Sequence, residues 1–200
     1  MIKAICFDLD GMYFEASGFQ LFKDALIRLG AKMEDINLYL HGDSMKAFKR
    51  GEIDEDDYWS SVIKSLGIDI TTAAIKELLV KNYKLNSEVH SLVLKAKEAG
   101  YKTCICSNNF ITRVRGLNDK FGFLDHFDVS VFSYEVKDLK PSPVIFKELL
   151  LRTAVKPEEL IYADDNADKL SGAQTLGINT FTFSSIDQFK EELVKLGVAL

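Results

Sequence analysis

Short apolar runs alternate with amphipathic stretches over most of this chain, and that alternation restricts the possible folds more than any other feature. Five apolar runs have the length and flanks of strands: residues 2–8, 102–106, 129–132, 160–163 and 179–183. Helical spacing of apolar residues occupies 89–99, 111–121, 144–151, 167–176 and 186–196. Strands that alternate with helices form βαβ units, whose right-handed crossovers put helices on both faces of a parallel sheet. The pattern predicts an α/β fold with a doubly wound (Rossmann-like) parallel sheet.

One long segment interrupts the alternation. Residues 15–85 contain no convincing strand, and their apolar residues recur at helical spacing up to Gly67. Asp54 precedes the last clear helix of this segment, where an aspartate caps the free N–H groups. We therefore predict an inserted all-helical cap domain at 15–85, carried by a core domain formed from 1–14 and 86–200.

Composition excludes several classes of protein. Hydrophobic residues make up 47% and charged residues 28%, so the chain can fill a core and is not intrinsically disordered. A net charge of −5 gives no general attraction for nucleic acid or anionic membranes. No apolar run has the length of a membrane span, and the first run meets Asp8 before a signal-peptide core is complete. We expect a cytoplasmic monomer or homodimer without nucleic-acid or membrane partners, whose three cysteines are reduced core residues.

Polar residues follow four of the predicted strands. These residues are Asp8, Asp10 and Gly11 after the first strand, Ser107 and Asn108 after the second, Lys140 after the third, and Asp164, Asp165 and Asp168 after the fourth. Ligands of doubly wound sheets bind beyond the carboxyl ends of the strands. The topology therefore predicts that carboxylates, a hydroxyl and an ammonium meet at one edge of the sheet.

These residue types suit phosphoryl transfer. Asp8 and Asp10 are two residues apart, so on an extended backbone they point the same way, and Gly11 permits a sharp turn after them. Clustered carboxylates need a cation among them, and hard oxygen ligands together with a substrate phosphate suit Mg²⁺. One carboxylate can then attack phosphorus while the other moves the proton. Ser107 and Lys140 can hold and neutralise the phosphoryl oxygens.

The four motifs, in this order, resemble those of the haloacid dehalogenase superfamily, and the helical insert resembles its cap. The resemblance covers essentially the whole chain; a DxDG motif alone is a weak sign, but four motifs on successive strand ends are specific. The stretches 50–53, 140–146 and 164–168 are similar to the branch that contains bacterial sugar-phosphate phosphatases and the phosphatase domain of soluble epoxide hydrolase. The resemblance implies Mg²⁺-dependent hydrolysis of a small phosphomonoester, such as a sugar phosphate, through an aspartyl-phosphate.

The resemblance also implies a role for each motif residue. Asp8 is expected to be the nucleophile, and Asp10 the general acid and base whose backbone carbonyl also binds Mg²⁺. Asp165 is the expected direct metal ligand, and Asp164 is expected to support the metal directly or from the next layer. The remaining expectations are phosphate binding by Gly11, Ser107 and Asn108, pairing of Lys140 with Asp8 and phosphate, and orientation of Lys140 or of metal-bound water by Asp168.

Three other functions are known or possible on the same fold, and one of them uses the same motifs. A phosphomutase of the β-phosphoglucomutase kind returns the phosphate to another hydroxyl, and a hydrolytic dehalogenase needs neither the acid Asp10 nor the metal ligand Asp165. A catalytically silent binding protein is the third alternative. It is suggested by Met12, which stands where the family usually has a small or β-branched residue and where a long side chain is expected to crowd the phosphate.

The insert offers several candidates for the substrate side of the pocket. Lys46, Lys49 and Arg50 form a basic stripe at helical spacing, which we interpret as a solvated face. Trp59 is interpreted as a core residue of the insert. Phe14 and Glu15, shortly after the expected nucleophile, are candidates for the pocket entrance.

Overall fold

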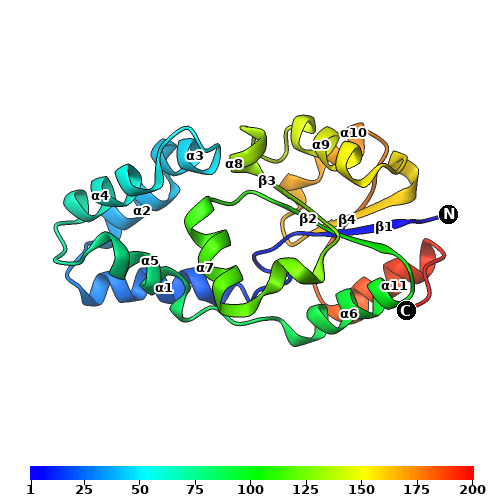
Figure 1. Ribbon diagram of the computed structural model, residues 1–200, viewed down its shortest axis with the longest axis horizontal. Helices are drawn as coiled ribbons and strands as arrows, with labels where there is room; N and C mark the ends of the chain where they lie inside the picture. Colours follow the sequence, from blue (N-terminus) through cyan, green and yellow to red (C-terminus); the bar gives the residue numbers. More distant parts are fainter.

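A computed structural model describes residues 1–200 and contains one five-stranded sheet in the order β3-β2-β1-β4-β5 (Figure 1). All four neighbouring pairs of strands are parallel. The strands are β1 (Ala4–Phe7), β2 (Lys102–Ser107), β3 (Val129–Phe132), β4 (Leu160–Asp164) and β5 (Asn179–Thr182). The predicted parallel sheet is confirmed, and the first strand is shorter at both ends than the apolar run that predicted it.

Different helices cover the two faces of the sheet (Figure 1). The larger core helices are α6 (Ser87–Glu98), α7 (Ile111–Phe121), α9 (Pro143–Thr153), α10 (Ser171–Thr175) and α11 (Ile186–Lys195). Ile5 and Phe7 of β1 belong to the hydrophobic cluster that includes residues of α6 and α11. Ala4 and Cys6 belong to the cluster on the other face, with residues of α9 and α10. This alternation is the period of two that a strand requires when both of its faces are buried.

Most of the residues between β1 and α6 form a helical insert, as predicted. Its helices are α1 (Ser17–Arg28), α2 (Met33–His41), α3 (Asp43–Lys49), α4 (Glu55–Leu66) and α5 (Thr72–Lys81). A separate cluster of 15 buried residues fills the insert, and Phe110 is the only member from outside it. The Asp54 side chain accepts from the N–H groups of the first turn of α4, and Gly67 ends that helix at a φ of 62°. Both predicted ends of this helix are therefore confirmed.

The two connections to the insert run side by side. Phe14 and Leu85 form an antiparallel bridge, and the Glu15 N–H donates to the Lys84 carbonyl at 3.0 Å. These contacts lie close to the boundaries that we predict for the two domains. The division into 1–14 with 86–200 and 15–85 remains a prediction.

The helix predicted over 167–176 is wrong as a single element. The structure has the 3-10 turn η3 (Ala167–Lys169) and then α10, because the Asn166 side chain accepts from the Asp168 N–H and caps a tighter turn. Gly172 in α10 also lies so close to the Pro141 carbonyl that a Cβ would overlap it.

The sequence pattern does not predict three other short helices. They are η1 (Phe123–His126), α8 (Ser133–Val136) and η2 (Pro157–Glu159). Elements of three or four residues are too short to show a periodic pattern. The longest helices have 12 residues, and none has the length and hydrophobicity to cross a membrane.

Candidate active site

One pocket of ≈ 300 Å³ lies where the ends of β1, β2 and β4 meet the helical insert. All but one of the predicted site residues line it: Asp8, Asp10, Gly11, Ser107, Asn108, Lys140, Asp164 and Asp165. Asp168 is the exception, because it is exposed and lies outside the pocket lining. The topology of the sheet thus brings the residues after four strands to one place, and their chemical roles remain predictions.

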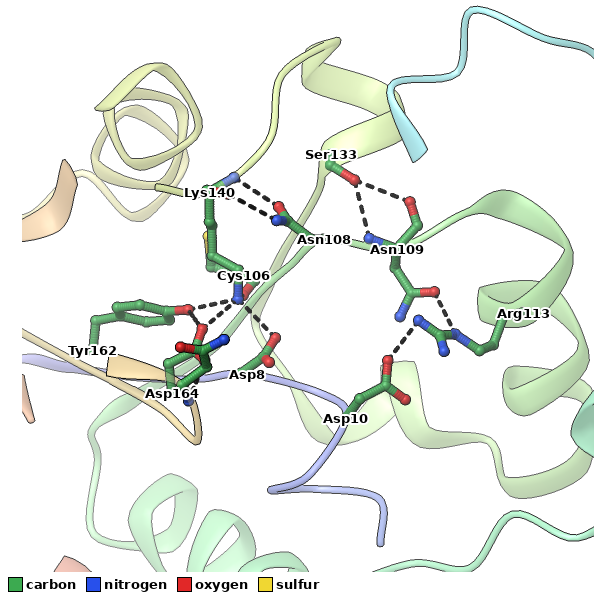
Figure 2. A network of polar contacts seen from close by, with 11 residues as sticks. Asp8, Asp10, Cys106, Asn108, Asn109, Arg113, Ser133, Lys140, Tyr162 and Asp164 are labelled. Atoms are coloured by element: carbon green, nitrogen blue, oxygen red, sulfur yellow. Dashed lines mark hydrogen bonds and ion pairs between the residues drawn. The ribbon is translucent and has the colours of Figure 1, made fainter. Parts of the chain in front are cut away.

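Lys140 is the centre of a buried polar network (Figure 2). Its Nζ donates to Asp8 Oδ1 at 2.9 Å and to Asp164 Oδ2 at 2.6 Å. The same atom contacts the Tyr162 hydroxyl at 2.6 Å and the Cys106 carbonyl at 3.0 Å. The Tyr162 hydroxyl also donates to Asp164. A residue from the loop between α8 and α9 therefore joins the ends of β1 and β4.

Lys140 and its two aspartate partners each stabilise the charged form of the other. Burial alone disfavours the Lys140 ammonium, but Asp8 and Asp164 raise the pKa of Lys140 above its ordinary value. Burial raises the pKa of Asp8, although Lys140 opposes that rise. Burial acts on Asp164 in the same direction, yet Lys140 and the hydrogen bonds outweigh it and lower the pKa of Asp164. Lys140 is consequently a permanent cation held next to the expected nucleophile.

Asn108 connects two of the loops that form the pocket. Its side-chain Nδ2 donates to the Lys140 carbonyl at 3.0 Å, and its Oδ1 accepts from the Lys140 N–H at 2.7 Å. Both ends of the side-chain amide are therefore engaged by the chain itself. Asn108 therefore positions Lys140, and the expected binding of phosphate by Asn108 remains a prediction.

A group of three carboxylates fits a hard cation. Oxygen atoms of Asp8, Asp164 and Asp165 all lie within 4.8 Å of one another. Asp165 is exposed, and partial burial together with its two acidic neighbours raises its pKa to about 6. A Cβ at Gly11 would overlap the Asp165 carboxylate, so the glycine leaves room for this side chain. Carboxylate oxygens with space beside them are the donor set that Mg²⁺ uses with a bound phosphate.

The Asp10 carboxylate does not belong to this group of three. It points toward Arg113, whose Nη2 lies 2.6 Å from Asp10 Oδ2 (Figure 2). Arg113 is buried, and it also donates to Asn109 Oδ1 at 2.7 Å and to the Tyr83 hydroxyl at 3.0 Å. Its guanidinium carbon lies 5.5 Å from the centre of the Phe19 ring. Asp10 is therefore fixed in a direction different from that of Asp8.

Sequence reasoning missed Arg113 completely. The residue lies in the first turn of α7, directly after the expected phosphate-binding loop. Cations are disfavoured at helix N-termini, where the helix dipole is positive. An arginine at this position of a predicted helix is a signal that a nearby carboxylate or an anionic ligand compensates for it.

The prediction that the basic stripe of the insert is a solvated face is correct only in part. Lys46 is exposed and pairs with Asp43 at 3.0 Å, and Arg50 pairs with Glu52 at 2.6 Å. Lys49 instead lines the pocket, so its interpretation as a solvated residue is wrong. Burial, followed by the neighbouring Arg113, lowers the pKa of the Lys49 ammonium to about 8.

Three aromatic or long apolar residues belong to the hydrophobic core. Trp59 is fully buried, as predicted, and its indole N–H donates to Thr112 Oγ1 at 2.9 Å. Met12 and Phe14 are fully buried in the cluster beneath the sheet, and neither lines the pocket. The expectations that Met12 crowds the phosphate and that Phe14 lines the entrance are wrong, because the turn at Gly11 directs the following residues into the core.

Comparison with known proteins supports the family expected from these motifs. The haloacid dehalogenase-like hydrolase family matches residues 2–177, and the chain belongs to this family. A D-ribitol-5-phosphate phosphatase of Bacteroides thetaiotaomicron is 23% identical over 207 residues, covering 96% of this chain and 97% of that protein. Bifunctional epoxide hydrolase 2 of Sus scrofa is 31% identical over 122 residues, which are 58% of this chain and 22% of the enzyme.

Solved structures share the fold. A haloacid dehalogenase family enzyme of Bacteroides thetaiotaomicron superposes with a TM-score of 0.79 at 22% identity, covering 96% of this chain and 98% of that one. The same enzyme in complex with magnesium and inorganic phosphate gives a TM-score of 0.75 at 24% identity, over 92% and 95% of the two chains. This similarity confirms the fold with its helical insert and extends over nearly the full length of both proteins.

Proposed function

We propose that this protein is a Mg²⁺-dependent phosphatase that hydrolyses a small phosphomonoester through an aspartyl-phosphate on Asp8. The observation that carries the proposal is the buried Lys140, joined to Asp8 and Asp164 beside the three-carboxylate group. A relative that is named D-ribitol-5-phosphate phosphatase and a structural neighbour in complex with magnesium and inorganic phosphate support it.

In the proposed first step, a carboxylate oxygen of Asp8 attacks phosphorus and the bond to the leaving oxygen breaks. Asp10 gives its proton to that oxygen, so the alcohol leaves neutral. Lys140 stabilises the charge on Asp8 and on the phosphoryl oxygens, together with Ser107 and the backbone N–H groups of its loop. Arg113 keeps the Asp10 side chain in one orientation during this transfer.

In the proposed second step, Asp10 takes a proton from water, and the water oxygen attacks phosphorus of the aspartyl-phosphate. The bond to Asp8 breaks, and inorganic phosphate is released. A bound Mg²⁺ would add positive charge beside the phosphoryl oxygens, and Asp8 and Asp165 with the Asp10 carbonyl are the groups that we expect to hold it. Asp164 is occupied by Lys140, Tyr162 and a backbone N–H, which favours a supporting role for it.

The experiment is phosphate release from a panel of phosphorylated sugars, nucleotides and small acids, with Mg²⁺ and with excess chelator. We expect Mg²⁺-dependent release by the natural protein and none by Asp8→Asn. Asp187→Asn, an exposed aspartate in the first turn of α11, is the matched control and should keep full activity. Mg²⁺-dependent turnover by folded Asp8→Asn would remove Asp8 as the nucleophile.

The same panel separates the alternatives. Isomerised sugar phosphate in place of free phosphate would indicate a phosphomutase, and halide release from a haloacid would indicate a dehalogenase. Metal binding without turnover on any substrate would indicate a silent binding protein. The structure weakens the reason for that last alternative, because Met12 lies in the core and outside the pocket.

A further inference from the structure

The pocket carries more positive side chains than the proposed chemistry uses. Besides Lys140, its lining includes Lys49 from α3, Arg113 from α7 and Lys169 from η3. His41 of α2 also lines the pocket. The whole chain has a net charge of −5, so three further strong cations in one pocket of ≈ 300 Å³ are a local feature and do not reflect composition. The lining also contains four aspartates, but three of them pair with Arg113 and Lys140, so Lys49 and Lys169 are the lining cations left without an ion pair.

Lys49 has no carboxylate partner, and Lys169 is the other lining cation without one. The neighbours of Lys49 in the sequence, Lys46 and Arg50, form ion pairs with Asp43 and Glu52, whereas Lys49 forms none. Burial and then Arg113 lower the pKa of Lys49, Lys169 adds to this effect, and Asp10 and Asp8 oppose it only in part. An unpaired cation in partly desolvated surroundings is unfavourable unless a ligand compensates for it.

The position of Lys49 is fixed by the core domain. Its backbone carbonyl accepts from Ser133 Oγ at 2.7 Å, and Ser133 Oγ in turn accepts from the Asn109 N–H at 3.0 Å. Two residues further on, the Gly51 carbonyl accepts from Lys137 Nζ at 2.6 Å. The end of α3 is therefore attached to the loop that follows Ser107, and Lys49 is held in the pocket by the fold.

The transferred phosphoryl group already has partners in the proposed mechanism, namely Lys140, the loop after β2 and the metal. We infer that Lys49, with Arg113 and Lys169, forms a subsite for a second anionic group, a carboxylate or a second phosphate, on the leaving part of the substrate. This inference rests on the proposed phosphatase function and narrows its substrate class to phosphomonoesters that carry two anionic groups.

The first test compares esters that differ in the second charge. Phosphoglycolate and 2-hydroxyethyl phosphate are of similar size, and ethane-1,2-diyl bisphosphate adds a phosphate in place of the carboxylate. We expect the natural protein to have a kcat/KM at least about tenfold higher for one or both of the doubly anionic esters than for 2-hydroxyethyl phosphate. Which of the two is preferred identifies the second group, and no preference for either overturns the inference.

Substitution of Lys49 assigns the preference to the subsite. Lys49→Gln should lower kcat/KM for the preferred doubly anionic ester by about 10- to 100-fold, mainly through KM, and by less than about threefold for 2-hydroxyethyl phosphate. Lys49→Arg should restore most of the loss, and Lys46→Gln on the exposed side of α3 is the matched control. Equal losses on both esters would mean that Lys49 contacts the transferred phosphoryl group, and this would refute the subsite.

A binding measurement separates this inference from the proposed function. Calorimetric titration of the Mg²⁺-loaded protein with 3-phosphonopropionate and with propylphosphonate needs no turnover. We expect the first compound to bind at least about tenfold more tightly, and Lys49→Gln to remove the difference. If no ester releases phosphate but this difference is present, the phosphatase proposal fails and the subsite stands. If phosphate is released but the two compounds bind equally, the subsite fails alone.

Discussion

Lys49 should reduce the stability of the free protein, and this cost can be worked out from its surroundings. Burial and Arg113 lower its pKa from 10.5 to about 8. That difference corresponds to about 3 kcal/mol of unfavourable free energy for the charged form at pH 7, where the lysine is protonated in both the folded and the unfolded chain. Solvent reaches part of the side chain and screens its interactions, so we expect a real cost of about 1–2 kcal/mol.

Lys49→Met should therefore raise the free energy of unfolding at pH 7 by about 1–2 kcal/mol, measured by urea unfolding without Mg²⁺ or phosphate. The folded-state pKa is depressed, so between pH 8 and about 10.5 the unfolded chain holds a proton that the folded chain has lost. The natural protein gains stability over that range, and the advantage of Lys49→Met should shrink toward zero. Lys46→Met, which changes an exposed lysine, should alter stability by less than about 0.5 kcal/mol at every pH.

Two results would refute this reasoning. Unfolding of Lys49→Met at the same urea concentration as the natural protein at pH 7 would show that the Lys49 ammonium is already solvated or paired. A gain that persists unchanged at pH 10 would show that the methionine acts through hydrophobic packing and that charge is irrelevant. Either result would also weaken the argument that an anionic ligand is needed beside Lys49.

Two further substitutions test the core of the site. Lys140→Met leaves the buried carboxylates of Asp8 and Asp164 without their cation. It should therefore lower the free energy of unfolding at pH 7 by about 3–5 kcal/mol in urea titrations. A loss below about 1 kcal/mol would show that the two carboxylates do not depend on Lys140 for their stability. Gly11→Ala puts a Cβ into the space of the Asp165 carboxylate, at a φ of +79° that disfavours alanine. It should weaken Mg²⁺ binding at least about tenfold by calorimetry, and unchanged affinity would exclude Asp165 from the metal site.

The sheet and the residues after its strands were predictable because the pattern that defines them is local. An apolar run of strand length, followed by polar residues, marks both the element and the edge at which ligands bind. Asp8, Lys140 and Asp164 lie far apart in the sequence, yet each directly follows or closely follows a predicted strand. The parallel topology alone was then sufficient to place them together.

The insert's contribution was not predictable in the same way. The direction of each residue on a short helix depends on how that helix packs against the core, and periodicity does not contain this information. Lys46, Lys49 and Arg50 look equivalent in the sequence, but only Lys49 faces the pocket. The prediction of a single helix over 167–176 failed for a related reason. A side-chain cap and a close contact with a distant loop determine the conformation of these residues.

The helix α7 connects the insert to the expected general acid and base. Thr112 accepts the Trp59 indole N–H at 2.9 Å and donates to Glu55 at 2.8 Å, so this residue faces the insert. The next residue, Arg113, pairs with Asp10 in the pocket. Adjacent positions of one helix thus contact the insert and the pocket, and the orientation of Asp10 depends on the same packing that brings Lys49 into the pocket. An anion on the leaving group would offset the unfavourable free energy of the charged, partly buried Lys49. Binding of such a substrate would therefore stabilise this packed arrangement relative to any in which the insert moves away from the pocket.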